Sequence, residues 1–456
     1  MIFAVDRPIA IPQAGTPIIR DWPLPPGRPQ PDLVGLQASN PRRYPGLFHS
    51  SGDSGWDVLF AFPGEIACIS ADSGLHALQA HPAMQLKPQR TSRPQHDLPF
   101  AGGWLCALAY ELGGVFEPSV GLVADADFPL AWLAHIPAAI LVERSSGRCV
   151  LLAESGQHAL IDAMAHDLAQ PPGPIPVLPA LDRLHEDDPA AFLAGVARIQ
   201  DYIRAGDVFQ VNLSRGWQAG FAAPVAPAAL FSRLMQRNPA PFSALLQMDE
   251  WAVVSSSPER LVRLDRNGVL HTRPIAGTHP RSDDAAEDAA LRARLQAHPK
   301  ERAEHVMLVD LERNDLGRVC EAGSVKVDAL MDIASYRHVH HIESTVSGTL
   351  REGMRVFDAL RAVFPGGTIT GCPKLRTMQI IQELEGVPRR SYTGSVGYIN
   401  HDGSFDFNIL IRSFLLRGRE LSFRAGAGIV ADSVAQRELD ETRAKARGLL
   451  RALGGS

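Results

Sequence analysis

Alternating apolar and polar positions predict most of the secondary structure of this chain. Before about residue 168, short apolar runs such as WDVLFAFPG, CISADSG and AAILVER are separated by turn residues, as in a sheet. The same pattern recurs later in FSALLQM, WAVVSSSP, HVHHIESTVSGTL, GSVGYIN, FNILIRSFLL and ELSFRAGAGIV. Few of these strands alternate with helices, so the pattern favours an α+β fold: a two-sheet β-sandwich core with helices packed outside it.

Helical periodicity appears mainly in the second half of the chain. DDPAAFLAGVARIQDYIRAGD predicts an amphipathic helix in which Asp188 is the N-cap and Pro189 is the first helical residue. Further helices are expected near residues 284–312, 355–363, 373–385 and 433–453.

A proline-rich, then acidic stretch at residues 169–189 predicts a linker. The expected organisation is a sheet-rich N-terminal region (residues 1–168), this linker, and a catalytic region (residues 190–456).

Composition excludes several classes of protein. Of the 456 residues, 45% are hydrophobic and 21% charged, which allows a large core. The net charge of −5 and the absence of long like-charge runs argue against nucleic-acid binding. The five scattered cysteines indicate reduced thiols, and we find neither a signal peptide nor a membrane-spanning stretch. These features predict a cytoplasmic protein.

Two pairs of glutamates stand out in predicted helices. Glu301 and Glu304 are spaced i, i+3, and so are Glu438 and Glu441, so each pair lies on one helical face. Taken alone, either pair is typical of a solvated helix surface. If the fold brings the pairs together, they make a site for a hard divalent cation.

Two glycine-rich segments could approach an anion. FRAGAGIVADS is expected to run from a strand through Gly426 and Gly428 into a helix capped by Asp432 or Ser433. FPGGTITGCPKLRTM is a hydroxyl-rich loop that leads into a helix starting near Pro373. Either segment can also be an ordinary turn or surface loop.

A histidine cluster and a single arginine are further candidates. In a strand, His338 and His340 share one face while His341 points to the other, so HVHH suits a proton shuttle better than a zinc site. Arg412 is a charge within the apolar strand FNILIRSF. It needs a carboxylate partner, either from the protein or from an acidic substrate.

The motifs together resemble the chorismate-utilising enzymes, namely the synthase subunits of anthranilate and aminodeoxychorismate synthases, with isochorismate and salicylate synthases as relatives. The resemblance is close over about residues 190–453 and looser before them. It implies the chorismate-utilising enzyme fold and a Mg²⁺ cofactor. The motifs, in order, are SSSPER, TRPIAGTHPR, ERAEHVMLVDLERNDLGRV, HHIESTV, FPGGTITGCPK, GSVGY, FNILIRS, GAGIVADS and ELDETRAKA.

The resemblance also implies a role for each candidate residue. Glu304 and Glu441 match the Mg²⁺ ligands, and Glu301 and Glu438 match outer carboxylates that act through water. Mg²⁺ would hold the ring carboxylate of chorismate. Glu259 matches the general acid that protonates the departing ring hydroxyl, and His341 matches the histidine that moves a ring proton. The positions that match substrate-binding groups are Gly277, Thr278, Tyr398, Arg412, Gly426, Gly428 and Lys445.

Two positions bear on the nucleophile and the product. Gln210 stands where isochorismate and salicylate synthases carry a lysine base, which favours ammonia over water. DVFQVNLS, NPAPFSALL and LPFAGGWLCALAYELG resemble aminodeoxychorismate synthase. Ala276, however, is the residue typical of anthranilate synthase, where many aminodeoxychorismate synthases have a lysine thought to attack the ring.

We therefore expect an aminodeoxychorismate synthase component I, which makes 4-amino-4-deoxychorismate for 4-aminobenzoate and folate synthesis. Ammonia would come from a separate glutamine amidotransferase subunit. The alternatives are an anthranilate synthase component I and a tryptophan-sensing, non-catalytic subunit. LFHSSG resembles the segment that lines a tryptophan pocket in this family, which makes Ser50, Pro241 and Phe242 candidate pocket residues. Otherwise LFHSSG is an ordinary buried strand.

Overall fold

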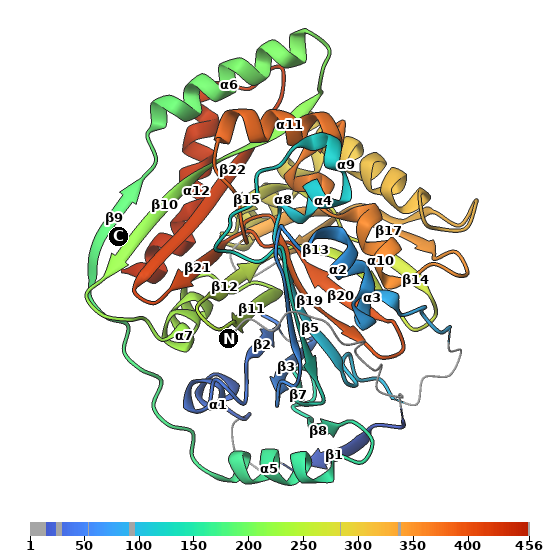
Figure 1. The fold of residues 1–456 in the computed structure, drawn as a ribbon. Helices are drawn as coiled ribbons and strands as arrows, with labels where there is room; N and C mark the ends of the chain where they lie inside the picture. Colours follow the sequence, from blue (N-terminus) through green and yellow to red (C-terminus); the bar gives the residue numbers. More distant parts are fainter. Residues whose placement is uncertain are drawn as a thin grey trace.

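The computed structural model describes residues 15–23, 30–52, 54–90, 96–282, 284–335 and 339–454. Two large antiparallel sheets pack face to face, and most helices cover their outer faces (Figure 1). The predicted α+β fold with a two-sheet core is therefore confirmed. Figure 1 also shows that α6, α11 and α12 gather at one end of the molecule, and α1 and α5 at the other.

The larger sheet has 12 strands, which come from both halves of the sequence. Its order is β1-β8-β7-β3-β2-β11-β12-β21-β22-β10-β18, with β9 also paired to β10. The strands are β1 (Ile18–Trp22), β2 (Gly46–His49), β3 (Trp56–Ala61), β7 (Ala138–Glu143), β8 (Cys149–Ala153), β9 (Leu181–Glu186), β10 (Gln210–Phe221), β11 (Phe242–Gln247), β12 (Ala252–Ser257), β18 (Gly371–Cys372), β21 (Ser413–Arg417) and β22 (Glu420–Ile429).

The smaller sheet has 10 strands in the order β15-β17-β14-β13-β20-β19-β5-β6-β4, with β16 also paired to β17. It too combines both halves of the chain, so the expected N-terminal and catalytic regions do not form separate sheets. The strands are β4 (Ile66–Ile69), β5 (Gly103–Leu108), β6 (Ala131–Ile136), β13 (Arg260–Leu264), β14 (Val269–Thr272), β15 (Ile275–Pro280), β16 (Lys326–Ser335), β17 (Val339–Thr349), β19 (Ser395–Asn400) and β20 (Phe405–Asn408).

Twelve α-helices are described, together with two short 3₁₀ turns, η1 (Pro118–Val120) and η2 (Gly367–Ile369). In the described part of the chain, none of these helices is long and apolar enough to cross a membrane. The helices are α1 (Leu33–Ser39), α2 (Gly74–Ala80), α3 (Pro82–Gln85), α4 (Leu112–Phe116), α5 (His158–Ala169), α6 (Pro189–Arg204), α7 (Pro227–Arg237), α8 (Ala285–Ala297), α9 (Pro299–Gly317), α10 (Val356–Val363), α11 (Lys374–Glu385) and α12 (Ala435–Leu453).

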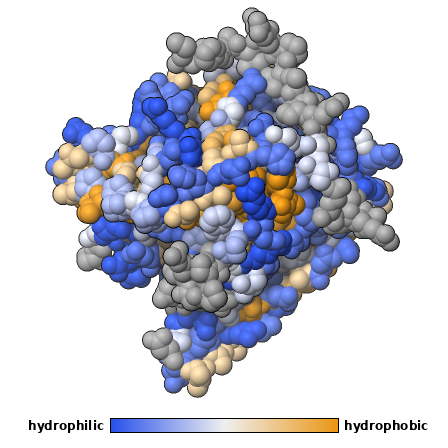
Figure 2. Space-filling model, turned by 90° about the horizontal axis from the view of Figure 1, so that it is seen from below, coloured by the Kyte–Doolittle hydropathy of each residue, from blue (hydrophilic) through white to orange (hydrophobic). Residues whose placement is uncertain are grey.

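The apolar alternation explains how the layers pack. Inward-facing side chains of both sheets, such as Phe60, Leu105 and Val396, form one buried cluster between the sheets. Other clusters lie under the helices on the outer faces. The outer surface seen in Figure 2 is mostly hydrophilic, with small hydrophobic patches.

Three local predictions need correction. The helix expected near residues 284–312 is two helices, because His298 caps the N-terminus of α9 and Pro299 follows it. Residues 181–186 of the predicted linker (169–189) form β9, which is part of the larger sheet. The N-cap of α12 is Val434, not Asp432 or Ser433.

Asp188 caps α6 as predicted: its side chain accepts a hydrogen bond from the Ala190 amide, and Pro189 begins the helix.

Candidate active site

The candidate site lies where the chain passes between the two sheets. Glu259 lies in the short connection from β12 in the larger sheet to β13 in the smaller one. Arg412 lies in the return connection, from β20 to β21. The two connections run side by side, since the Ile409 amide donates to the Glu259 carbonyl (3.0 Å) and the Ser256 amide to the Arg412 carbonyl (3.1 Å).

Glu259 is a buried acid with an altered proton affinity. Glu259 is 4% exposed, and burial raises the pKa of its carboxyl to about 7. The Thr368 hydroxyl and the charges of Lys445 and Arg412 oppose that rise. Glu259 therefore holds or releases a proton near neutral pH, as a general acid must.

His341 faces the same site from β17. Its Nδ1 lies 3.2 Å from the Gly277 carbonyl oxygen, and because a carbonyl only accepts, Nδ1 carries the hydrogen and Nε2 is the unprotonated nitrogen. Burial and the neighbouring Arg412 charge lower the pKa of His341 to about 4, so the ring is neutral at pH 7. The adjacent His340 instead contacts Asp288 (3.0 Å), so the two histidines have different partners as the strand alternation predicts; His338 lies outside the described residues.

Arg412 carries an unusual backbone and a buried charge. Its φ is +51°, and burial lowers the pKa of its guanidinium, while the Glu259 carboxyl acts to raise it. Of the two kinds of partner expected from the sequence, Glu259 is the protein carboxylate whose charge reaches Arg412.

The two glycines of FRAGAGIV lie in β22 rather than in a turn. They face β10, where Asn212 pairs with Gly428 and Ser214 with Gly426. A Cβ on Gly428 would come within 2.4 Å of the Gln210 amide nitrogen, so the glycine leaves room for the Gln210 side chain in its present position. The Lys445 ammonium donates to the Gly426 carbonyl (3.0 Å) and pairs with Glu441 (2.8 Å).

The sequence prediction named one tyrosine and missed another. The ring of Tyr398 packs against Phe48 and Phe100 and lines a cavity described below. Tyr392 is the tyrosine beside the glycine strand, since a Cβ on Gly426 would lie 2.9 Å from its hydroxyl. The two lie in the same motif, SYTGSVGYIN, and the sequence carries no signal that separates them.

Two further buried acids were also missed. Burial, with the Asp315 charge adding to it, raises the pKa of Glu312 to about 8, and the Glu259 charge acts on the same carboxyl. Asp315 forms an ion pair with Lys374 at 2.5 Å. Their i, i+3 spacing in ERND resembles that of the glutamate pairs and was the available signal.

The glutamate pairs begin the two helices that flank the site. Glu301 and Glu304 lie in α9, which packs on β15 and β17, and Glu438 and Glu441 lie in α12, which packs on β22. Glu301 approaches the histidine side of the site, since a Cβ on Gly277 would lie 2.9 Å from its carboxylate. Glu438 is buried, at 6% exposed.

The donor chemistry of these carboxylates suits Mg²⁺, which prefers oxygen ligands. Within the described part of the chain, no three of the four bring their oxygens within 4.8 Å of one another. A cation held here would therefore complete its shell with water or substrate oxygens, which is usual for Mg²⁺.

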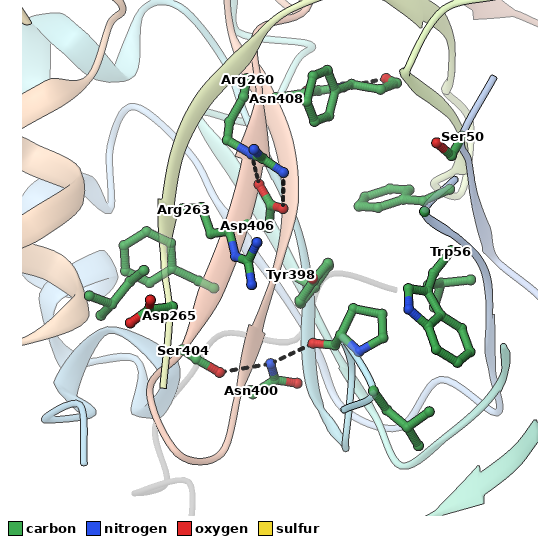
Figure 3. A pocket seen from close by; sticks show the side chains of 18 of the residues that line it. Ser50, Trp56, Arg260, Arg263, Asp265, Tyr398, Asn400, Ser404, Asp406 and Asn408 are labelled. Carbon is green, nitrogen blue, oxygen red and sulfur yellow. Dashed lines mark hydrogen bonds and ion pairs between the residues drawn. The ribbon is translucent and has the colours of Figure 1, made fainter. Parts of the chain in front are cut away.

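A separate cavity of about 550 Å³ lies between the sheets. All three candidate residues of the tryptophan pocket, Ser50, Pro241 and Phe242, line it. Figure 3 shows Ser50 and Trp56 on one side and the Arg260–Asp406 ion pair on the other.

The remaining predicted positions lie on β15. Ala276 is opposite Ile342 in the pairing with β17, and the Thr278 backbone is opposite His341. Residue 276 is thus next to the candidate site.

Comparison with known proteins gives a family match over most of the chain. The sequence profile described as "chorismate binding enzyme" matches residues 44–451. The chain is 41% identical over 365 residues to an anthranilate synthase component I-like protein of Synechocystis sp., covering 79% of this chain and 74% of the relative. It is 47% identical over 262 residues to aminodeoxychorismate synthase component 1 of Bacillus subtilis, covering 58% of this chain and 55% of that relative.

Solved structures agree on the fold. Anthranilate synthase component I from Streptococcus pneumoniae superposes with a TM-score of 0.75 at 30% identity, covering 88% of this chain and 93% of that one. The menaquinone-specific isochorismate synthase MenF from Escherichia coli has a TM-score of 0.70 at 23% identity, covering 98% and 96%, which is a likeness of fold alone.

Proposed function

Because this chain belongs to the chorismate binding enzyme family, we propose that it is the synthase subunit that converts chorismate and ammonia to 4-amino-4-deoxychorismate, a step toward 4-aminobenzoate and folate. The observation that carries the proposal is the buried Glu259, whose pKa of about 7 suits proton donation, beside Arg412 and His341.

Each of these groups has a task in that reaction. Protonated Glu259 gives its proton to the ring hydroxyl that leaves. Arg412 and Lys445 attract the enolpyruvyl carboxylate, because both bring positive charge close to Glu259. His341, neutral and protonated on Nδ1, accepts the proton that the ammonia nitrogen loses once it has bonded to the ring. A ring proton is lost only in the anthranilate alternative, where pyruvate leaves.

Two amide side chains of β10 support ammonia as the nucleophile. The buried amide oxygens of Gln210 and Asn212 have no hydrogen-bond partner among the described residues. The two residues are spaced i, i+2, so their side chains share one face of the strand. Amide oxygens accept hydrogen bonds and are poor bases, so they can orient ammonia through its N–H groups without activating water.

The carboxylates of Glu301, Glu304, Glu438 and Glu441 would hold Mg²⁺, with Glu304 and Glu441 as direct ligands. When bound, the ion supplies positive charge at the ring carboxylate of chorismate.

The product assay tests this function. The purified chain is incubated with chorismate, Mg²⁺ and ammonium, with and without an aminodeoxychorismate lyase, and the Glu259→Gln variant serves as the inactive control. We expect 4-aminobenzoate only when the lyase is present. Anthranilate fluorescence without lyase would instead identify an anthranilate synthase, and tryptophan binding without chorismate consumption would identify the non-catalytic alternative.

Anthranilate synthesis is a second candidate because of Ala276. This side chain cannot attack the ring, so the covalent route of lysine-bearing relatives is closed at this position. An Ala276→Lys variant restores the amine of the lysine-bearing relatives, on β15 opposite Ile342. For an aminodeoxychorismate synthase we expect higher 4-aminobenzoate production from this variant; for an anthranilate synthase we expect loss of anthranilate without a gain of the 4-amino product.

The ammonia donor would be a separate glutamine amidotransferase subunit, as the "component" names of the relatives suggest. Glutamine should then replace ammonium only when that subunit is added.

Tryptophan is the ligand we propose for the 550 Å³ cavity. Its aromatic lining, which includes Phe48 and Phe242, suits an indole ring, and Arg263 offers a positive charge for a carboxylate (Figure 3). Titration calorimetry should give one site for tryptophan, weakened in an Arg263→Gln variant and unchanged in Arg292→Gln, at an exposed arginine of α8 that does not line the cavity.

A further inference from the structure

Two histidines and a glutamate meet at a place that the proposed reaction does not use. His135 is in β6, Glu154 directly follows β8, and His401 directly follows β19. The Nε2 atoms of His135 and His401 lie 2.9 Å and 2.6 Å from the same oxygen, Oε1 of Glu154. Among the described residues, this is the one group of three potential metal ligands whose donor atoms all lie within 4.8 Å of one another.

Backbone hydrogen bonds hold the three residues in place, and the His135 amide donates to the Glu65 carbonyl (2.9 Å). The Glu154 amide donates to the Pro137 carbonyl (2.8 Å), and the His401 amide donates to the Gly102 carbonyl (3.3 Å). Gly102 has a φ of +95°, and a Cβ there would come within 2.8 Å of Glu154 Cγ. A glycine is therefore needed for the Glu154 side chain to reach both imidazoles.

An aromatic wall holds the imidazoles in place. The Trp104 ring lies 4.9 Å from the His401 ring and 5.8 Å from the His135 ring, centroid to centroid. The side chains of His135, Glu154 and His401 are 20%, 15% and 9% exposed, respectively. Such packing limits the rotamers available, which lowers the cost of organising ligands around an ion.

The donor set is that of a transition metal. Two imidazole nitrogens and one carboxylate oxygen form a known zinc set, completed by water in the fourth position. Zinc bonds of about 2.0–2.2 Å in a tetrahedron place ligand atoms roughly 3.3 Å apart, so the present separations would open by less than about 1 Å. Nitrogen donors also distinguish this cluster from the all-carboxylate set of α9 and α12, which suits Mg²⁺.

We propose that His135, Glu154 and His401 form a binding site for a divalent transition metal ion of the zinc class, separate from the active site. The ion would join the two sheets, because Glu154 follows a strand of the larger sheet and both histidines belong to the smaller one. It would also hold the end of β19, where Asn400 lines the 550 Å³ cavity. A bound ion would therefore stabilise the packing of the two sheets next to that cavity. This inference does not rest on the proposed reaction.

His135 and His401 both hydrogen-bond the Glu154 carboxylate. In the absence of metal these hydrogen bonds hold the cluster together. A bound ion would be held by two nitrogen bonds and one oxygen bond instead, with each imidazole carrying its hydrogen on Nδ1.

Metal binding by the whole chain tests the proposal. The protein is treated with EDTA, returned to buffer with millimolar Mg²⁺ to occupy carboxylate sites, and titrated with Zn²⁺ by calorimetry. A Cys68→Ser background removes the exposed thiol as a competing ligand. We expect one equivalent of Zn²⁺, a change in Trp104 fluorescence and a rise in melting temperature.

Variants assign the site. Glu154→Gln and His401→Gln should each weaken Zn²⁺ binding at least tenfold, while His185→Gln, at an exposed histidine of β9, should not. Co²⁺ bound to the parent protein should give the visible d–d bands of a site with nitrogen and oxygen ligands, without thiolate charge transfer. This measurement does not require the variants to fold. The proposal is overturned if no stoichiometric Zn²⁺ or Co²⁺ binding is detected, or if both ligand variants bind as tightly as the parent; the cluster is then a hydrogen-bonded group only.

Discussion

The Nδ1 atom of His341 lies 3.2 Å from the carbonyl oxygen of Gly277, and the same glycine has a φ of +61° with the Glu301 carboxylate against its α-carbon. One backbone position thus orients the histidine and leaves room for an acid of α9.

Replacing Gly277 with alanine should reduce activity more than stability. The new Cβ would lie 2.9 Å from a Glu301 oxygen and from Leu295, and a left-handed φ costs an alanine about 1–2 kcal/mol. We expect at least a tenfold fall in kcat/KM for chorismate. Gly74→Ala is the matched control, since Gly74 has a φ of +57° with open space around it, and its strain should leave kcat/KM unchanged. Equal kcat/KM values for the two variants would contradict the assigned role of Gly277.

Glu259 should give a pH dependence in both rate and stability. As the general acid it must be protonated, so kcat/KM should fall as the pH rises above about 7. Glu259→Gln keeps the shape but cannot donate the proton, and should lower kcat by about 10²–10⁴-fold.

Stability should fall over the same direction of pH change as the rate. Because the folded pKa of Glu259 is raised from 4.5 to about 7, the folded state retains a proton that the unfolded state releases, and stability is lost as pH rises through this window. At pH 8 the Gln variant should therefore be more stable than the parent by up to about 3 kcal/mol, and the difference should shrink toward pH 4. Urea unfolding of both proteins at several pH values measures this difference in unfolding free energy. If the difference does not change with pH, Glu259 is not buried as a neutral acid.

Sequence reasoning succeeded where a pattern is local. Alternation and helical periodicity predicted the two-sheet fold, and an N-cap with a following proline predicted the start of α6. It failed where the structure depends on pairing between segments that are far apart in the sequence. Nothing local in LFHS tells that β2 pairs with β11, about 200 residues later, so neither the mixed sheets nor the sheet-to-sheet crossings at Glu259 and Arg412 were predictable.

The two tyrosines illustrate the same limit. Tyr392 and Tyr398 have similar surroundings in sequence, but Tyr392 precedes β19 and meets Gly426, while Tyr398 lies within β19 and faces the cavity. Only the position of β19 between β20 and β5 separates their roles. In the same way, the His135, Glu154 and His401 cluster combines residues too far apart in sequence to form a motif.

Removal of an outer carboxylate should weaken the metal requirement rather than abolish it. Glu438 is buried at the start of α12, where we expect it to act on Mg²⁺ through water. Glu438→Gln should raise the Mg²⁺ concentration for half-maximal activity by about 10–100-fold, and EDTA should inactivate the parent enzyme reversibly. Glu420→Gln, at a partly exposed residue paired with Arg183, is the control. An unchanged Mg²⁺ dependence in the Glu438 variant would remove this residue from the proposed metal site.

The last prediction concerns the buried ion pairs that support β10. The Glu385 carboxylate contacts Arg389 at 2.6 Å and Arg424 at 3.0 Å, and both the Glu385 and Arg389 side chains are 1% exposed. Arg389 also donates to the Asn212 carbonyl (2.8 Å), on the strand that carries Gln210. Glu385→Ala leaves two guanidinium groups without their carboxylate, which should cost about 3–5 kcal/mol of unfolding free energy in urea. Glu383→Ala, at a more exposed glutamate of the same helix that contacts the Tyr202 hydroxyl, should cost less than about 1 kcal/mol. A similar loss of unfolding free energy in the two variants would contradict this prediction. It would mean that the ion pairs of Glu385 do not stabilise β10.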